Sequence, residues 1–174
     1  MSQISHKLGV IVPFRLRDEH LKIFIDKIDE HLKNQNIDYE LIVVNQDNAK
    51  QFNRGMLLNI GYLYAKKLRC DYLVFHDVDM IPLSVNYNYS HIPLHLATDF
   101  YYADGEKQRE IFDSYFGGVT LFPVEVFEEI DGYSNKYWGW GYEDDDLLFR
   151  CEKHHISLDK KSFKNIGKRN YLKL

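Results

Sequence analysis

Two short runs of acidic residues could carry chemistry. In the first, Asp77 and Asp79 directly follow the apolar run Tyr72–His76. Two carboxylates at this spacing, at the end of a strand, can share one ligand. Carboxylate oxygens suit hard divalent cations such as Mg²⁺ and Mn²⁺, and such an ion can offset the charge of a leaving diphosphate. A solvated Asp-x-Asp turn is the alternative, and the hydrophobic run before the pair makes the two interpretations comparable.

The second run is Glu143–Asp146, four consecutive acids that follow the aromatic and glycine-rich stretch Trp138–Tyr142. A helix dipole favours carboxylates in the first turn by roughly 0.3–1 kcal/mol each, which accounts for one or two acids better than for four. A carboxylate beside an incoming hydroxyl can act as a general base, worth about 10²–10⁴ in rate. Neighbouring carboxylates can also accept hydrogen bonds from sugar hydroxyls. We therefore favour a functional role over a purely structural acidic turn.

Arginines and glycines form two further candidate groups. Phe14–Arg17 and Phe52–Arg54 each place arginine beside an aromatic residue. Arginine binds phosphate through two parallel charge-assisted bonds, and the aromatic ring can contact a base or ribose. Surface ion pairs explain each segment equally well. The pair Gly117-Gly118 inside an apparent strand predicts either a close approach of a ligand or of another backbone segment, or a bulge.

The histidines do not indicate a zinc site. His154 and His155 are adjacent, so on a helix they point in different directions and are expected at the surface. His91 and His95 have helical spacing, but Pro93 between them argues against a regular helix. No Ser/His/Asp or Cys/His arrangement stands out, and no GxxxxGK phosphate loop is present.

Alternating elements in the first half of the chain would position these groups. Leu8–Pro13, Tyr39–Val44 and Tyr72–His76 are short apolar runs that predict buried strands. Helical patterns separate them, so the order strand, helix, strand, helix, strand predicts a parallel sheet with helices on its faces. In such sheets ligands bind beyond the carboxyl ends of the strands. The arginines, Gln46-Asp47 and the Asp77–Asp79 pair all fall at those ends.

The two helical patterns are amphipathic. We expect the first helix to begin with Asp18 as its N-cap, and the second to begin with Asn53 as its N-cap. The apolar stripe of the first contains Leu21, Phe24, Ile25, Ile28 and Leu32. The apolar positions of the second include Met56, Leu57, Ile60, Tyr64 and Leu68.

The second half is less regular. It predicts a loop over 84–90, polar stretches over 99–104 and 106–113, a strand over 115–123, a short helix over 124–130, a glycine-rich loop over 132–141 and a helix over 143–153.

Length and charge narrow the class of protein. The 174 residues are typical of one domain. The net charge of −4 gives no basic excess for nucleic acid, and the basic end, Lys160–Lys173, reads as a solvated tail. Cys70 and Cys151 cannot make a disulfide framework or a four-ligand zinc site, although one bridge between them stays open. No run predicts a membrane-spanning segment or signal peptide.

Read together, the segments resemble the β-1,4-galactosyltransferase family (glycosyltransferase family 7) over about residues 8 to 158. Within that family, Val44–Gln46 and His76–Leu83 look most like the xylosylprotein 4-β-galactosyltransferase branch. The segments that carry the resemblance are Val12–Arg17, Phe52–Arg54, Leu57–Gly61, His76–Pro82, Tyr115–Val119, Tyr137–Gly141 and Glu143–Asp146.

The resemblance implies an α/β protein with the GT-A glycosyltransferase fold: a single domain, residues 1–174, with a mostly parallel central sheet flanked by helices. It implies an inverting, metal-dependent transfer of galactose from UDP-galactose to a sugar hydroxyl of a glycan acceptor, with Mn²⁺ as the cofactor or another divalent cation in its place. Asp144 matches the catalytic base and Asp79 the metal ligand. Glu143 and Asp145 match acceptors of hydrogen bonds from sugar hydroxyls, and Trp140 matches a tryptophan that lines both donor and acceptor. The positions that match the donor site are Pro13, Phe14, Arg15, Arg17, Phe52, Arg54, Asp77, Val78 and Gly118.

One position bears on the donor sugar. Tyr115 matches a bulky residue that crowds the sugar's 2-position, which implies galactose over N-acetylgalactosamine. The family also takes metal ligands from a His-containing segment about thirty residues beyond the Trp-Gly-Trp-Gly stretch. Here Gly167–Leu174 holds no histidine. Truncation of the chain, water ligands in place of histidine, or weak metal binding would each fit.

Three alternatives stay open. The same mechanism could use UDP-N-acetylgalactosamine or another UDP-sugar. A catalytically weak binding module with this fold would fit the missing histidine, although four retained acids argue against it. A metal-dependent phosphoesterase built on the Asp77–Asp79 pair fits less well. For location, the absence of a predicted membrane anchor leads us to expect a cytoplasmic protein of bacterial or viral origin, or a soluble part of a longer protein.

Overall fold

The structure is a computed structural model that describes residues 6–102, 115–160 and 166–169; within 99–102 and 166–169 only the backbone is described. The strands are β1 (Lys7–Phe14), β2 (Asp38–Asn45), β3 (Tyr72–His76), β4 (Met80–Pro82), β5 (Leu94–His95), β6 (Asp99–Tyr102), β7 (Val119–Pro123) and β8 (Ile166–Arg169). The helices are α1 (Asp18–Asn34), α2 (Arg54–Lys67), α3 (Val124–Glu129) and α4 (Glu143–Lys153).

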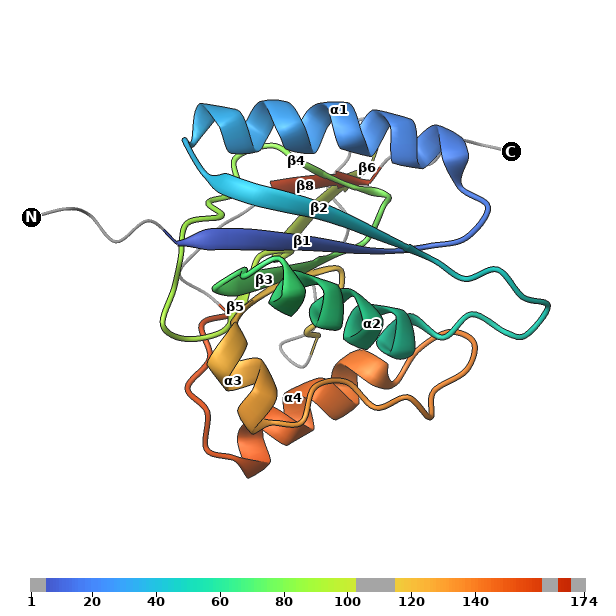
Figure 1. Ribbon diagram of the computed structural model, residues 1–174, viewed down its shortest axis with the longest axis vertical. Coiled ribbons are helices and arrows are strands. Elements are labelled where there is room, and N and C mark those ends of the chain that lie inside the picture. Colours follow the sequence, from blue (N-terminus) through green and yellow to red (C-terminus); the bar gives the residue numbers. More distant parts are fainter. Residues whose placement is uncertain (1–5, 103–114, 161–165, 170–174) are drawn as a thin grey trace, which may run out of the picture.

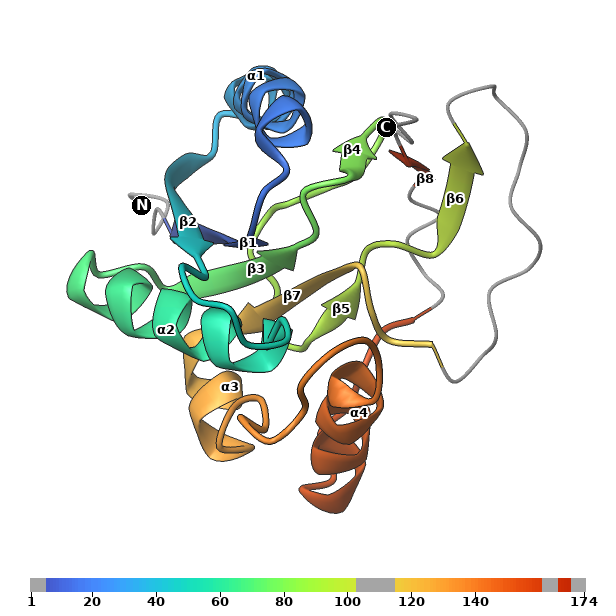
Figure 2. The same ribbon diagram turned by 90° about the vertical axis from the view of Figure 1, so that its right-hand side faces the viewer.

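A five-stranded sheet in the order β2-β1-β3-β7-β5 forms the centre of the molecule (Figure 1; β7 is labelled in Figure 2). The strands β2, β1 and β3 are parallel, as the alternation of strands and helices predicts. β7 is antiparallel to both β3 and β5, so it alone runs against the other four strands. Because β1, β2 and β3 end at the same edge, the residues after Phe14, Asn45 and His76 lie together there.

Helices cover both faces of this sheet (Figure 2). α1 lies on one face, and α2, α3 and α4 lie on the other. A hydrophobic core lies on each face of the sheet, and side chains of β1 point alternately into one or the other. Leu8, Val10 and Val12 pack with Phe24 of α1, whereas Ile11 packs with buried residues of α2 on the opposite face. A small sheet in the order β4-β8-β6 lies beside α1. Its strand β4 begins directly after Asp79 and pairs with β8, so the segment 166–169 runs close to the Asp77–Asp79 turn.

The face of α2 that packs on the sheet differs from the prediction. Ile60, Tyr64 and Leu68, expected in the apolar stripe, are 36%, 54% and 42% exposed. Instead Gly61 and Ala65 are buried, together with Gly55, Leu57 and Leu58. The reason is close packing: a Cβ at Gly61 would lie 2.2 Å from Cγ2 of Ile11. The helix approaches β1 so closely that only small side chains fit between them.

Gly61→Ala should therefore destabilise the fold. Overpacking a core by one methyl group costs about 1–3 kcal/mol, and the gain in helix propensity of up to about 1 kcal/mol offsets only part of it. We expect urea unfolding to show a net loss of about 1–2 kcal/mol. Leu63→Ala, at a position of the same helix that is 54% exposed, is the control and should stay within about 0.5 kcal/mol. A Gly61→Ala protein as stable as the wild type would contradict the close packing.

Two further details correct the sequence predictions. α1 has Arg17 rather than Asp18 in the N-cap position, and no side chain makes a cap hydrogen bond; Asp18 lies in the first turn, where its charge suits the helix dipole. β7 begins at Val119, and residues 115–118 before it lie in neither a helix nor a strand. The expected cap of α2 is confirmed, because the side-chain oxygen of Asn53 accepts a hydrogen bond from the amide of Met56.

The structure also answers whether the two cysteines form a disulfide and whether a described helix could span a membrane. Cys70 and Cys151 are both buried and unbridged, and burial raises the pKa of their thiols to about 11 and about 12. Within the described residues, no helix combines the length and the apolar composition that crossing a membrane requires.

Candidate active site

Arg54, the first residue of α2, joins the two acidic runs. Its Nε donates to Oδ1 of Asp77 at 2.7 Å, and its Nη1 donates to Oδ1 of Asp144 at 2.7 Å. The carboxylate of Glu143 lies 3.6 Å from the same Nη1, and the guanidinium lies 5.9 Å from the ring centre of Tyr133. Burial opposes the charge of Arg54, but the surrounding carboxylates raise its pKa well above the ordinary value. Arg54 is thus a permanent cation at the centre of the acid cluster.

Asp144 occupies an environment that suits a general base. Its side chain is 20% exposed. Burial raises its pKa, Arg54 opposes that shift, and Glu143 and Asp77 add to it, so that the pKa of Asp144 is about 7. A carboxyl with a pKa near neutrality can take a proton from a hydroxyl more readily than an ordinary aspartate.

The Asp77–Asp79 turn is fixed by its backbone and by two arginines. The carbonyl of Asp77 accepts hydrogen bonds from Met80 N at 3.1 Å and from Nδ1 of His76 at 3.0 Å. Asp79 is 8% exposed, and Nη1 of Arg17 donates to its Oδ2 at 3.2 Å. Because burial outweighs the attraction of Arg54, the pKa of Asp77 is raised. The turn therefore presents two carboxylates, each already paired with a different arginine.

The Gly117-Gly118 pair closes the site from the β7 side. Gly117 lies against the carboxylate of Asp144: a Cβ there would come 2.4 Å from Oδ2 of Asp144. Gly118 has a φ of +76°, a conformation that favours glycine. Its carbonyl accepts a hydrogen bond of 2.9 Å from the amide of Asp77. The half-buried Tyr115 lies against both glycines, so the predicted close approach is a contact between this turn and the acids.

The predicted donor-site residues are brought to one edge of the sheet but differ in accessibility. Arg15 and Phe52 lie together, with the guanidinium carbon 5.4 Å from the ring centre, and Nη1 of Arg15 donates to the carbonyl of Lys50 at 2.7 Å. Pro13 is buried within β1. Phe14 and Val78, 8% and 6% exposed, belong to the hydrophobic core, so little of either side chain remains for a ligand.

The loop before α4 presents aromatic rings to solvent. Trp140 is 97% exposed, and Trp138 lies under Nζ of Lys50 at 5.4 Å. Tyr142, with a φ of +72°, stands immediately before α4. Asp145 is exposed. Trp140 and Asp145 therefore lie outside the buried ionic network and are free to contact a ligand from the solvent side.

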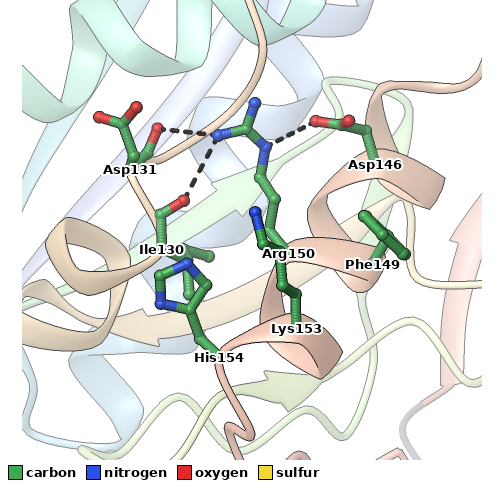
Figure 3. Close-up of a pocket in the computed structure, with 7 residues that line it drawn as sticks. All are labelled: Ile130, Asp131, Asp146, Phe149, Arg150, Lys153 and His154. Carbon is green, nitrogen blue, oxygen red and sulfur yellow. Dashed lines mark hydrogen bonds and ion pairs between the residues drawn. The ribbon is translucent and has the colours of Figure 1, made fainter.

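Besides the exposed Asp145, the acids of this run have two kinds of surroundings. Glu143 and Asp144 lie close to Arg54, whereas Asp146 accepts a hydrogen bond of 2.7 Å from Nε of Arg150 (Figure 3). Nη1 of Arg150 also lies 3.4 Å from the carbonyls of Ile130 and Asp131, so it links α4 to the preceding loop. Asp146 therefore fits the purely structural explanation, an acidic first turn of a helix. The functional explanation applies to Glu143 and Asp144, the acids near Arg54. Glu143, predicted as a sugar contact, is 7% exposed.

The carboxylates of the Asp77–Asp79 turn are suitable ligands for a hard divalent cation, but there are few of them. The buried carboxylate of Asp79 is an oxygen donor of the kind that Mn²⁺ and Mg²⁺ accept. Within residues 6–98 and 115–160, no group of three or more His, Cys, Asp or Glu side chains could enclose a metal ion. An ion at Asp79 would take its other ligands from a bound diphosphate, from water or from outside this part of the chain. The segment 170–174, where the sequence lacks the family's histidine, lies outside the described residues.

Two buried residues contribute to the site although the sequence assigned neither of them a role there. Gln46 donates from Nε2 to the carbonyl of Gln51 at 2.9 Å and accepts from the amide of Asn53 at 2.8 Å, which shapes the loop before Arg54. His95 donates from Nε2 to the carbonyl of Gly117 at 2.9 Å. The position of Gln46 after a strand pointed to this edge of the sheet, whereas no local pattern signalled His95.

Comparison with known proteins agrees with this geometry. Residues 2–91 match the N-terminal region of glycosyl transferase group 7, and residues 103–173 match the N-terminal domain of galactosyltransferase. β-1,4-Galactosyltransferase 4 of Cricetulus griseus is 38% identical over 157 residues, which are 88% of this chain and 45% of that protein. Xylosylprotein 4-β-galactosyltransferase of Caenorhabditis elegans is 35% identical over 161 residues, 90% of this chain and 54% of that protein. The chain thus spans about half the length of the curated relatives it matches.

A crystal structure supports the fold assignment. A mutant of Drosophila β-1,4-galactosyltransferase 7, in complex with manganese, UDP-Gal and xylobiose, superimposes with a TM-score of 0.81 and 34% identity. The match covers 91% of this chain and 66% of that one. The architecture is the GT-A fold, as the sequence predicted.

The relatives correct one prediction. A cytoplasmic protein of bacterial or viral origin was expected, but the curated relatives named above are animal proteins and extend well beyond the span that this chain covers. The expectation was wrong because it depended on the lack of a predicted membrane anchor, and that lack carries no information about the origin of a protein.

Proposed function

Because the chain belongs to glycosyl transferase group 7, the β-1,4-galactosyltransferase family, we propose that it transfers galactose from UDP-galactose to a sugar hydroxyl of a glycan acceptor, with inversion at the anomeric carbon. The observation that carries this proposal is the Asp144 carboxyl, whose pKa is about 7 and which one arginine connects to the Asp77–Asp79 turn. The complex of the Drosophila relative with manganese, UDP-Gal and xylobiose supports the choice of donor and metal.

In this proposal Asp144 takes the proton of the acceptor hydroxyl as its oxygen attacks the anomeric carbon of the donor. The bond from that carbon to the diphosphate breaks, and UDP leaves with the electron pair. Arg54 holds Asp144 in place, and Glu143 keeps the surroundings of the base negative. Arg15 and Arg17 would bind phosphate or uridine, with Phe52 beside them. Mn²⁺ held by Asp79 would offset the charge that develops on UDP.

The direct test measures UDP release from a panel of UDP-sugars, with and without Mn²⁺, and with β-linked glycosides that include a β-xyloside. The expected result is Mn²⁺-dependent release from UDP-galactose that an acceptor increases. A folded protein that releases no UDP from any donor would overturn the proposal and favour a binding module. Release of sugar phosphate without an acceptor would instead indicate phosphoesterase activity.

The pH dependence follows from the raised pKa of the base. Asp144 holds its proton until the pH approaches about 7, and the protonated carboxyl cannot accept a proton from the acceptor. We therefore expect kcat/KM for the donor to fall about tenfold per unit as the pH drops below about 7, and to level off above it. A profile that stays flat down to about pH 5.5 would contradict Asp144 as the base.

The donor choice is tested at Tyr115. If its ring crowds the 2-position of the sugar, Tyr115→Leu should raise the use of UDP-N-acetylgalactosamine relative to UDP-galactose by about 10–200-fold, the effect of a steric change in a pocket. Tyr64→Leu, at a position that is 54% exposed on α2, is the matched control and should leave the ratio unchanged. A wild-type protein that already prefers the N-acetylated donor would reject this role of Tyr115 and support the alternative transferase.

A further inference from the structure

The turn at residues 117–119 is strained. The amide of Val119 donates to the carbonyl of Gly117 at 2.9 Å, two residues back in the chain. The residue between them, Gly118, has a φ of +76°. A three-residue turn with this hydrogen bond and a positive φ is the rarer, strained form of γ-turn. Such strain persists only where the surroundings hold it.

His95 supplies one of these external contacts. Its Nε2 lies 2.9 Å from the carbonyl oxygen of Gly117; since a carbonyl can only accept, the imidazole carries its proton on Nε2. The ring is 3% exposed, and burial lowers its pKa to about 4, so it is neutral near pH 7. Its centre lies 5.4 Å from the ring of Tyr115 and 5.6 Å from that of Phe116.

The two-residue strand β5 holds His95 itself. His95 is paired with Thr120 of β7, and its amide donates to the carbonyl of Asp159 at 2.9 Å. On the other side of the turn, the carbonyl of Gly118 accepts from the amide of Asp77. The turn is therefore fixed from both sides, by His95 and by the start of the Asp77–Asp79 segment.

We propose that His95 is a positioning residue: its Nε2–H bond to the Gly117 carbonyl, with its packing on Tyr115, holds the strained turn at the distance from Asp144 that transfer requires. Gly117 contacts the carboxylate directly, since a Cβ at this position would lie 2.4 Å from Oδ2 of Asp144. A small shift of the turn would move the base and Tyr115 relative to each other. This inference rests on the proposed function insofar as Asp144 is the base.

Two substitutions separate the hydrogen bond from the packing. His95→Phe keeps a ring and removes the donor, whereas His95→Gln places an amide N–H at about the distance of Nε2. A misplacement of about 1 Å can cost about 10²-fold in rate. We expect kcat of His95→Phe to fall by about tenfold to a hundredfold, with UDP affinity by calorimetry unchanged, and His95→Gln to recover most of the loss.

His31→Phe is the matched control. Nε2 of His31 also bonds a carbonyl, that of Val85 at 2.6 Å, and its ring also lies against a tyrosine. The same substitution there should leave kcat unchanged at a temperature where all variants are folded. Equal kcat in the wild type and both His95 variants would overturn the proposal.

A second measurement does not need activity. Hydrogen exchange of the Asp77 and Val119 amides, both bonded to this turn, should accelerate in His95→Phe and not in His31→Phe. A wild-type protein that transfers no sugar would refute the proposed function, while the exchange rates would still decide whether His95 holds the turn. Unchanged exchange of both amides in His95→Phe would refute the role of His95.

Discussion

Replacing Asp144 by asparagine should lower kcat by about 10²–10⁴, the usual contribution of a general base. Asparagine keeps the size of the side chain and one oxygen for Arg54, but it cannot accept the proton of the acceptor hydroxyl. Because the change removes a negative charge without opening a cavity, the protein should remain folded. Steady-state transfer with saturating donor and acceptor measures the loss, and calorimetry with UDP and Mn²⁺ checks that the nucleotide still binds.

Asp146→Asn is the matched control for this experiment. It makes the same substitution two residues further along the same acidic run, but Asp146 contacts Arg150 on the far side of α4. It should leave kcat close to the wild-type value. Equal activity of the wild type and Asp144→Asn would remove Asp144 as the base, whatever the control shows.

Arg54→Met should destabilise the fold more than any other substitution considered. The side chain of Arg54 is 11% exposed and contacts Asp77 and Asp144 at 2.7 Å each. Removing one partner of a buried ion pair costs about 3–5 kcal/mol, because the charge left behind is uncompensated. We expect urea unfolding near pH 7.5 to show a loss of that size, and no measurable transfer. Near pH 5.5 the loss should be smaller, since protonation removes the unpaired charges.

Arg17→Met distinguishes this effect from the loss of any arginine at the site. The side chain of Arg17 is 53% exposed and faces the single carboxylate of Asp79 at 3.2 Å, so the cost should be at most about 1 kcal/mol. Arg54→Met should also reduce the free energy of unfolding less in a protein that already carries Asp144→Asn than in the wild type, because the two residues are coupled. Similar losses of unfolding free energy in Arg54→Met and Arg17→Met would contradict the position of Arg54 at the centre of the acid cluster.

Local patterns in the sequence predicted most of the elements. The apolar run of β3 and the helical spacing of α4 gave their bounds correctly, and Asn53 caps α2 as expected. The prediction of the buried face of α2 was wrong. Sequence patterns assign large apolar residues to the interior, whereas α2 lies so close to β1 that only the small residues Gly61 and Ala65 fit between them. That approach depends on Ile11, a residue of another element, and its trace within the helix is the pair of small residues Gly61 and Ala65, which an apolar-stripe pattern passes over.

The composition of the site was more predictable than its connections. Acids after β3 and at the start of α4 were candidates because of their position and number. The role of Arg54 as their common counter-ion was not predicted, since it requires two distances between residues far apart in the chain. The same holds for His95, whose bond to Gly117 depends on how a two-residue strand pairs with β7.

The bond between Arg54 and Asp144 joins residues 90 positions apart. During synthesis, α2 leaves the ribosome long before α4 exists, so a nascent chain carries the cation and the Asp77–Asp79 turn without the proposed base. The reversed strand β7, which brings the Gly117-Gly118 turn to the acids, also comes late. On the proposed mechanism, a partly made chain therefore lacks the carboxylate that would take the proton of the acceptor hydroxyl until α4 has docked.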